Sequence, residues 1–189
     1  MKTLILCDRQ SASFHSYDLR ALTRAVADVA CTDTSLITLD GGELAPCRGC
    51  FLCWVKTPGL CSITNDKANA LAAQQISADV LILLSEICFG GFSFDIKSYL
   101  DRMIPTISPF FEIFAGEMHH KMRYRDFPVI ITIGYGGHSS KEHQTFIDLA
   151  GRNALNLHPP RHYVFTIKDS SAVKEVLKDL RAALVEVTE

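Results

Sequence analysis

Residues 80–84 read Val-Leu-Ile-Leu-Leu, an unbroken aliphatic run near the middle of the chain. A short run with no polar residue indicates a strand that is buried on both faces of a sheet. Such strands are typical of parallel sheets, because parallel neighbours need crossover connections that cover the faces with helices. Residues 80–84 are therefore predicted to form a central strand.

Segments of strand and helix character alternate on both sides of this run. Further strands are expected at residues 3–7, 35–39, 128–133 and 163–167. Helices, identified mainly by apolar residues at spacings of three and four, are expected at residues 16–29, 66–77, 94–104, 141–155 and 171–187. Asp66 is expected to be the N-cap of the second helix.

This alternation predicts an α/β fold with a doubly wound, five-stranded parallel sheet and helices on both faces. Right-handed crossovers leave few topologies, and five strands suit the flavodoxin-like order 2-1-3-4-5. Ligands of such sheets bind beyond the carboxyl ends of the strands. We therefore expect function in the loops that follow the strands.

Composition narrows the classes of function. The 189 residues include 19 basic and 21 acidic side chains, and 48% are hydrophobic. A nearly neutral chain lacks the basic footprint of a nucleic-acid-binding domain, and this apolar content argues against disorder. No apolar run is long enough to span a membrane, and the apolar run within residues 1–8 is too short for a signal-peptide core. We expect one cytoplasmic domain over residues 1–189, with reduced cysteines and no nucleic-acid or membrane partner.

Two connections are longer than ordinary turns, at residues 40–65 and 104–126. Long connections in compact domains are usually functional or disordered. The first contains a cysteine-rich segment, residues 46–61. The second is rich in aromatic and basic residues and is expected to line a subunit interface or to act as a lid, since large apolar groups need burial.

The cysteine-rich segment has the spacing C-x2-C-x2-C-x7-C, formed by Cys47, Cys50, Cys53 and Cys61. Thiolates two residues apart can converge on one cluster from a tight turn, so four of them suit a [4Fe–4S] cluster or, less well, zinc. They can equally form a redox pair or pack a turn as small apolar side chains. We prefer the redox or packing interpretation to an iron–sulfur cluster, and we prefer a cluster to zinc.

The chain resembles the NADPH-dependent FMN reductase branch of the flavodoxin-like flavoproteins, which includes the iron–sulfur flavoproteins. Three motifs in the family's order carry this resemblance. They are the Cys-Arg-Gly-Cys-Phe-Leu-Cys of residues 47–53 followed by Cys61, the Ala-Asp and aliphatic strand of residues 78–84, and the Lys-Ser-Tyr-Leu-Asp-Arg of residues 97–102. The motifs are fairly specific for the family but not for a substrate.

The resemblance implies an FMN-binding oxidoreductase that passes electrons from NAD(P)H through the flavin to a small-molecule acceptor, as a homodimer or homotetramer. The flavin performs the chemistry in such enzymes, so no catalytic residue is named. Glu86 and Cys88 are the first residues to test beside the flavin N5.

The resemblance also places the FMN contacts in three loops. The phosphate would lie beside Arg9, Ser11, Ser13, Ser16 and Tyr17. The flavin ring would face Glu86, Ile87, Cys88, Phe89, Gly90 and Gly91, where Glu86 replaces the usual proline and Cys88 the usual tyrosine. A third turn comprises Tyr135, Gly136 and Gly137, and Tyr135 is expected to stack on the outer edge of the ring. The competing interpretation is that these serines cap a helix and these glycines form ordinary turns.

Two alternatives of other classes stay open. One is an iron–sulfur flavoprotein electron carrier, in which the four cysteines hold a cluster that feeds FMN. The other is a flavodoxin-like module without a cofactor that binds a protein partner through the aromatic connection. The electron acceptor and the choice between NADH and NADPH leave no trace in the sequence.

Overall fold

The computed structural model describes residues 1–9, 19–30 and 33–188. In this part of the chain, five parallel strands form the main sheet in the order β2-β1-β3-β7-β8. Their bounds are Lys2–Cys7 for β1, Asp33–Thr38 for β2, Val80–Cys88 for β3, Val129–Gly136 for β7 and His162–Ile167 for β8. The predicted flavodoxin-like order is confirmed.

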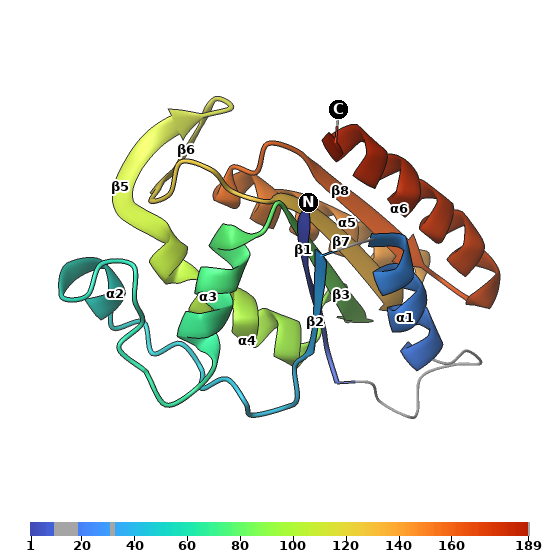
Figure 1. The fold of residues 1–189 in the computed structure, drawn as a ribbon, viewed down its shortest axis with the longest axis horizontal. Coiled ribbons are helices and arrows are strands. Elements are labelled where there is room, and N and C mark those ends of the chain that lie inside the picture. The colour runs from blue at the N-terminus through green and yellow to red at the C-terminus, as the bar shows by residue number, and fades with distance from the viewer. Residues whose placement is uncertain (10–18, 31–32, 189) are drawn as a thin grey trace.

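The sheet is apolar on both faces because helices cover both. Helices α1 (Leu19–Ala30) and α6 (Val173–Thr188) pack on one face, and α3 (Ala68–Ser77), α4 (Phe94–Arg102) and α5 (Ser140–Leu157) pack on the other. Figure 1 shows this layered arrangement, with α1 and α6 opposite α3 and α4. Successive strand residues point to opposite faces, so Ile82 enters one core and Leu81 the other. This two-sided burial explains the unbroken aliphatic run.

Helix α3 begins slightly later than expected. Asp66 was predicted to be its N-cap, but the helix starts at Ala68 and Lys67 occupies the N-cap position. The Asp66 carboxylate still accepts a hydrogen bond from the Ala68 amide at 3.0 Å. Its second role is in an ion pair with Arg102, described below, which draws it away from the capping position.

Strand β3 extends beyond the predicted segment and turns back on itself. Residues Gly91–Phe92 form β4, which pairs antiparallel with the end of β3, and Phe89 and Gly90 make the two-residue turn with φ of 53° and 81°. Positive φ at both central residues matches a type I′ turn, whose twist suits a hairpin. A Cβ at Gly90 would lie 2.8 Å from the Cβ of Thr145 on α5, so the hairpin packs tightly against that helix.

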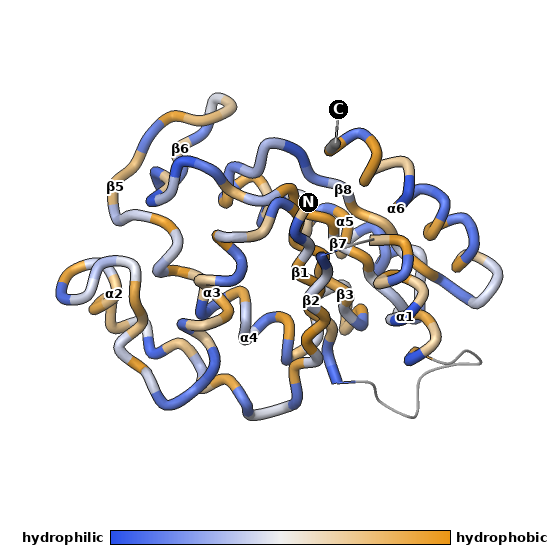
Figure 2. The backbone as a smooth tube through the Cα atoms, in the orientation of Figure 1, coloured by the Kyte–Doolittle hydropathy of each residue, from blue (hydrophilic) through white to orange (hydrophobic). Residues whose placement is uncertain are grey.

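The aromatic and basic connection is a β-hairpin rather than an irregular loop. After a 3₁₀ turn at Ile104–Thr106, strands β5 (Ile107–Phe114) and β6 (Glu117–Met122) pair antiparallel. Figure 1 shows the hairpin projecting from the body of the protein, and Figure 2 shows hydrophobic residues along β5. Phe110, Ile113 and Met118 are each about two-thirds exposed or more, at 69%, 71% and 68%. Their expected interface or lid role stays a prediction.

No helix in the described ranges has the length and apolar character that crossing a bilayer would require.

The packing of β7 against α5 yields a stability prediction. A Cβ on Gly134 would lie 2.5 Å from Cε1 of buried Phe146 and 3.0 Å from Cδ1 of Ile87. Gly134→Ala is therefore expected to lower the free energy of unfolding by about 1–3 kcal/mol through overpacking. Urea denaturation monitored by circular dichroism measures it.

Gly151→Ala is the matched control. Gly151 lies inside α5, and apart from the backbone of its own helix and its two chain neighbours, no atom in the described part of the chain is within 4 Å of its added Cβ. This variant is expected to raise the free energy of unfolding by about 0.5–1 kcal/mol, because alanine loses less backbone entropy in a helix. Equal stabilities of the two variants would contradict the packing described for Gly134.

Candidate functional site

The carboxyl ends of β1, β3 and β7 meet at one edge of the sheet, at the bottom of Figure 1. Strand order reverses between β1 and β3, since the chain leaves β1 for β2 on one side and later returns to β3 on the other. The loops at such a switch point separate and leave a crevice for a ligand. The three loops predicted to contact FMN all begin at this edge.

Asp8 joins the three strand ends. Its side chain is buried and accepts hydrogen bonds from the Glu86 amide at 2.6 Å and from the Tyr135 hydroxyl at 2.5 Å. Burial raises the pKa of the Asp8 carboxyl, although these hydrogen bonds act in the opposite direction. Because the carboxylate accepts from both β3 and β7, it holds the ends of β1, β3 and β7 together.

Tyr135 does not have the role predicted for it. Its side chain is only 3% exposed and lies in the core on the α1 and α6 face of the sheet. Burial and the charge of Asp8 raise the pKa of its hydroxyl, which donates to Asp8. The ring is therefore not placed for stacking on the outer edge of a ligand, and the expectation is corrected. Tyr135 supports Asp8 from within the protein.

Arg9 lies just after the end of β1, at this edge of the sheet. Its guanidinium forms an ion pair with Asp40 at 3.1 Å, and its backbone amide donates to Asp95 at 3.2 Å. Both partners of the ion pair are well exposed, so the pair is weak and can exchange for another anion. The other predicted phosphate contacts, Ser11, Ser13, Ser16 and Tyr17, lie outside the described residues.

The residues predicted to face the flavin ring lie at the end of β3 and in the turn after it, and their side chains differ in exposure. Ile87 is buried and Cys88 is half-buried, whereas Phe89 at the turn is 95% exposed. Desolvation, followed by the charges of Glu86, Asp8 and Glu142, raises the pKa of the Cys88 thiol to about 11. Cys88 is therefore a neutral thiol at physiological pH.

The turn after β7 requires its glycines. Gly136 and Gly137 have φ of 78° and 77°, which side chains rarely adopt. A Cβ on Gly137 would lie 3.3 Å from His143 Nε2 and 3.4 Å from Ile87 Cγ2. The turn thus brings bare backbone to the crevice beside the loop after β3. The Nδ1 atom of His143, just behind it, is buried and has no hydrogen-bond partner among the described residues.

A second candidate site lies in the cysteine-rich segment. Cys47, Cys50, Cys53 and Cys61 line one small cavity together with Arg102 and neighbouring residues. The four thiols also interact electrostatically. Burial raises the pKa of the Cys53 thiol, and the charges of the other three motif cysteines raise it further. In contrast, the Leu52 amide and the Ser62 hydroxyl lower the pKa of exposed Cys50. Four thiols from a 15-residue segment therefore share one site.

The four cysteines line the same cavity but do not form a site for a single ion. No group of three or more His, Cys, Asp or Glu side chains in the described ranges is placed to hold a single metal ion. A tetrahedral zinc site needs all four sulfurs about 2.3 Å from one ion, so this arrangement disfavours zinc. A [4Fe–4S] cluster takes four separate thiolates, which is the number of cysteines that line this cavity.

Three anchors hold the segment in place. The Cys61 amide donates to Asn69 Oδ1 at 2.8 Å, and Asn69 Nδ2 donates back to the Cys61 carbonyl at 3.0 Å. The Trp54 indole on the short helix α2 (Leu52–Val55) donates to the carbonyls of Ile104 and Ile107, each at 3.1 Å. The third anchor, Arg102, donates to three parts of the chain.

Arg102 is the functional candidate that the sequence analysis missed. Its side chain is fully buried and paired with Asp66, and the guanidinium also donates to the carbonyls of Ala45 and Ile63. Hydrogen bonds from Arg102 and from two amides lower the pKa of Asp66, against the effect of its burial. The signal was present, because Arg102 ends the Lys-Ser-Tyr-Leu-Asp-Arg motif, but the motif did not reveal its partners.

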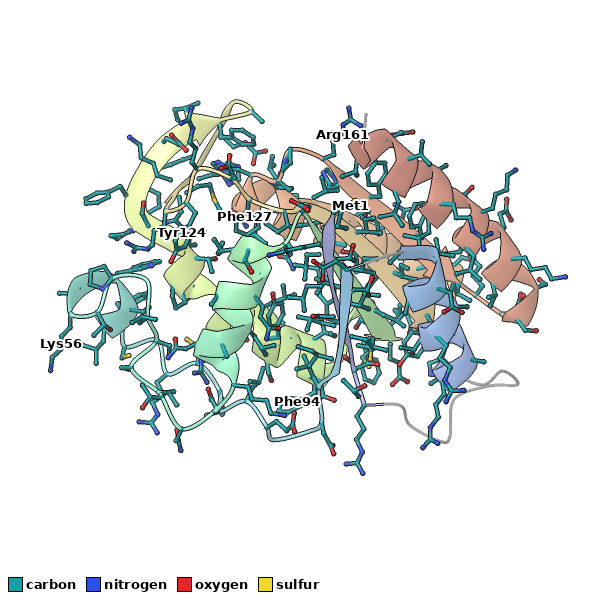
Figure 3. All side chains as sticks on the ribbon, in the orientation of Figure 1. Met1, Lys56, Phe94, Tyr124, Phe127 and Arg161 are labelled. Carbon is teal, nitrogen blue, oxygen red and sulfur yellow. The ribbon has the colours of Figure 1, made fainter. Side chains whose placement is uncertain are left out.

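Helix α4 connects the two candidate sites. Its first residues, Phe94 and Asp95, lie at the crevice, and its last residue, Arg102, lines the cysteine cavity. Figure 3 shows Phe94 near the strand ends and Lys56, which follows α2, far to the other side. Nine helical residues span about 14 Å, which sets the scale of the separation.

Comparison with known proteins finds one curated relative. No family model matches the chain. An iron–sulfur flavoprotein of Methanocaldococcus jannaschii is 37% identical over 87 residues, which is 46% of this chain. The matched region is 43% of that relative, so less than half of its length is represented. The match agrees with the resemblance found in the sequence motifs.

Solved structures match nearly the whole chain at low identity. The NAD(P)H:quinone oxidoreductase of Methanothermobacter marburgensis has a TM-score of 0.63 at 13% identity and covers 100% of this chain and 98% of its own. An FMN-dependent NADH-azoreductase of Bacillus anthracis, solved with FMN, has a TM-score of 0.61 at 9% identity and covers 100% of both chains. At these identities the likeness establishes the architecture, and this chain has the flavodoxin-like α/β fold.

Proposed function

We propose that this protein is an FMN-binding, NAD(P)H-dependent oxidoreductase that passes electrons through the flavin to a small-molecule acceptor. The observation that carries the proposal is that Asp8 joins the ends of β1, β3 and β7 at the switch point of the sheet, where such folds bind their ligands. The fold is shared with an FMN-dependent azoreductase and a quinone oxidoreductase, which supports the same use of this crevice.

The residues at the crevice fit FMN in their chemistry. Arg9 is an exposed cation whose weak ion pair can be exchanged for a phosphate, and Ser11, Ser13 and Ser16 would add hydroxyl donors. Gly136 and Gly137 would offer bare backbone to the flat ring, beside residues 86–91. When bound, FMN supplies hydride acceptance and electron transfer.

The protein's own groups at the crevice hold protons at defined positions. Cys88 is a neutral thiol with a pKa of about 11, which makes it a hydrogen-bond donor rather than a nucleophile. Burial keeps the pKa of Asp8 raised, and its two acceptor oxygens are occupied by Glu86 and Tyr135. Cys88 and Glu86 are thus the side chains to test beside the flavin, whereas Asp8 orients the loop that carries them.

We also propose that the protein assembles as a homodimer or homotetramer. The exposed aromatic and aliphatic residues of the β5–β6 hairpin support an interface, because large apolar side chains rarely gather on a monomer's surface.

The FMN proposal is tested by comparing FMN with riboflavin, which lacks the phosphate. Arg9→Ala is expected to weaken FMN binding by about 10-fold or more, because a charge-assisted hydrogen bond contributes about 1.5–3 kcal/mol, and to leave riboflavin affinity unchanged. Flavin fluorescence quenching measures both affinities. Arg181→Ala is the control. It makes the same charge change at an exposed position of α6 and should alter neither flavin affinity.

An equal loss of affinity for both flavins would contradict a phosphate role for Arg9. Wild-type protein that binds neither flavin would contradict the proposed function and favour a module without a cofactor.

A second candidate function is electron transfer through a [4Fe–4S] cluster on Cys47, Cys50, Cys53 and Cys61. The specific observation in its favour is that these four cysteines line one cavity whose segment is anchored by hydrogen bonds. The curated relative, an iron–sulfur flavoprotein by its name, supports the same interpretation. Such a cluster would deliver single electrons to the flavin and so couple a one-electron partner to two-electron chemistry.

Iron content separates the two candidates. Anaerobically purified protein is expected to contain about four irons per chain and to absorb broadly near ~400 nm. Cys61→Ser is expected to lose most of this iron, whereas Cys88→Ser, outside the motif, should retain it. Wild-type protein that contains no iron, and whose four motif thiols all react with an alkylating reagent, would contradict the cluster. The four cysteines would then have a redox or packing role.

A further inference from the structure

The guanidinium of Arg102 has one hydrogen-bond donor left over. Arginine carries five N–H donors in a fixed plane. Nη1 donates to Asp66 Oδ2 and to the Ala45 carbonyl, both at 2.6 Å, and Nη2 donates to Asp66 Oδ1 at 3.1 Å and to the Ile63 carbonyl at 3.3 Å. The fifth donor, Nε–H, is buried and has no hydrogen-bond partner among the described residues.

An unpaired donor of this kind is costly. Leaving a buried polar group without a partner costs about 1–3 kcal/mol, and more for a charged group. The Arg102 side chain has 0% exposure, so bulk water does not reach it. The four bonds made by Nη1 and Nη2 already fix residues 45, 63 and 66, and a purely structural role would not need the fifth donor to remain unpaired.

The position of Arg102 indicates what the donor serves. Arg102 lines the same cavity as Cys47, Cys50, Cys53 and Cys61. Cys61 is near enough to interact with the guanidinium, and its backbone is clamped to Asn69 by two hydrogen bonds. A protonated thiol is a weak acceptor, whereas a thiolate accepts strongly. The donor therefore matches Cys61 in its metal-bound, thiolate form.

We propose that Arg102 is a positioning residue for the iron–sulfur site, whose Nε–H donates to the thiolate sulfur of Cys61 and makes the cluster easier to reduce. This inference rests on the second candidate function, the cluster on the four cysteines. Reduction adds negative charge to the cluster, and a buried hydrogen bond to a ligand sulfur stabilises that charge. Hydrogen bonds to the sulfurs are among the factors that set cluster potentials.

Arg48 provides a matched comparison. It lines the same cavity and also carries a guanidinium, but it is exposed, so solvent screens its charge. Arg102→Gln and Arg48→Gln remove the same charge from the two positions. Only the first removes the buried donor.

The experiment is an EPR-monitored redox titration of anaerobically purified, cluster-loaded protein. Arg102→Gln is expected to lower the equilibrium constant for cluster reduction at least 10-fold, about 59 mV for a one-electron couple, while Arg48→Gln changes it much less. Equal potentials in wild type and Arg102→Gln would overturn the inference, as would equal shifts in the two variants. A wild type without iron would refute the cluster itself, which is a different result.

A measurement on the unaltered side chain decides the matter if Arg102→Gln fails to fold or to bind iron. Pulsed EPR of the reduced, cluster-loaded protein grown with nitrogen-15 arginine is expected to detect a nitrogen coupling to the cluster. The coupling should persist in Arg48→Gln. Its absence from wild-type protein would overturn the proposed hydrogen bond.

Discussion

The structure depends on the burial of a parallel sheet on both faces. Helices α1 and α6 cover one face and α3, α4 and α5 the other, so the strand ends rather than the sheet faces are free to carry chemistry. The buried carboxylate of Asp8 connects the ends of β1, β3 and β7 by accepting from Glu86 and Tyr135. This fixes the segments that follow β3 and β7 relative to one another, and the candidate ligand site lies at the switch point between β1 and β3.

The cysteine cavity is tied to the same framework through α4. Its first turn faces the crevice, where Asp95 accepts from the Arg9 amide, and its last residue supplies the buried Arg102–Asp66 pair. The hydrogen bonds of Arg102 Nη1 and Nη2 hold the segments before and after the cysteines. Two sites with different chemistry are thus linked by one rigid helix.

Much of the fold was predictable because aliphatic runs and helical spacing are local signals. Residues 80–84 predicted the central strand, and the alternation of elements predicted the order of the sheet. The β5–β6 hairpin was missed because its strand pattern in the sequence is weak. Tertiary contacts hold its base, such as the hydrogen bonds from the Trp54 indole to the carbonyls of Ile104 and Ile107. Tyr135 was misplaced because β7 continues past Ile133, which turns its ring into the core. Arg102 and Asp66 are 36 residues apart, and no local pattern reveals such a pair.

The central claim is that the strand-end crevice binds FMN. A crystal structure of the protein grown with FMN tests it most directly. We expect the ring against residues 86–91 and the Gly136–Gly137 turn, and the phosphate at Arg9. A crevice filled by the protein's own side chains, with no flavin density at the ends of β1, β3 and β7, would contradict the account.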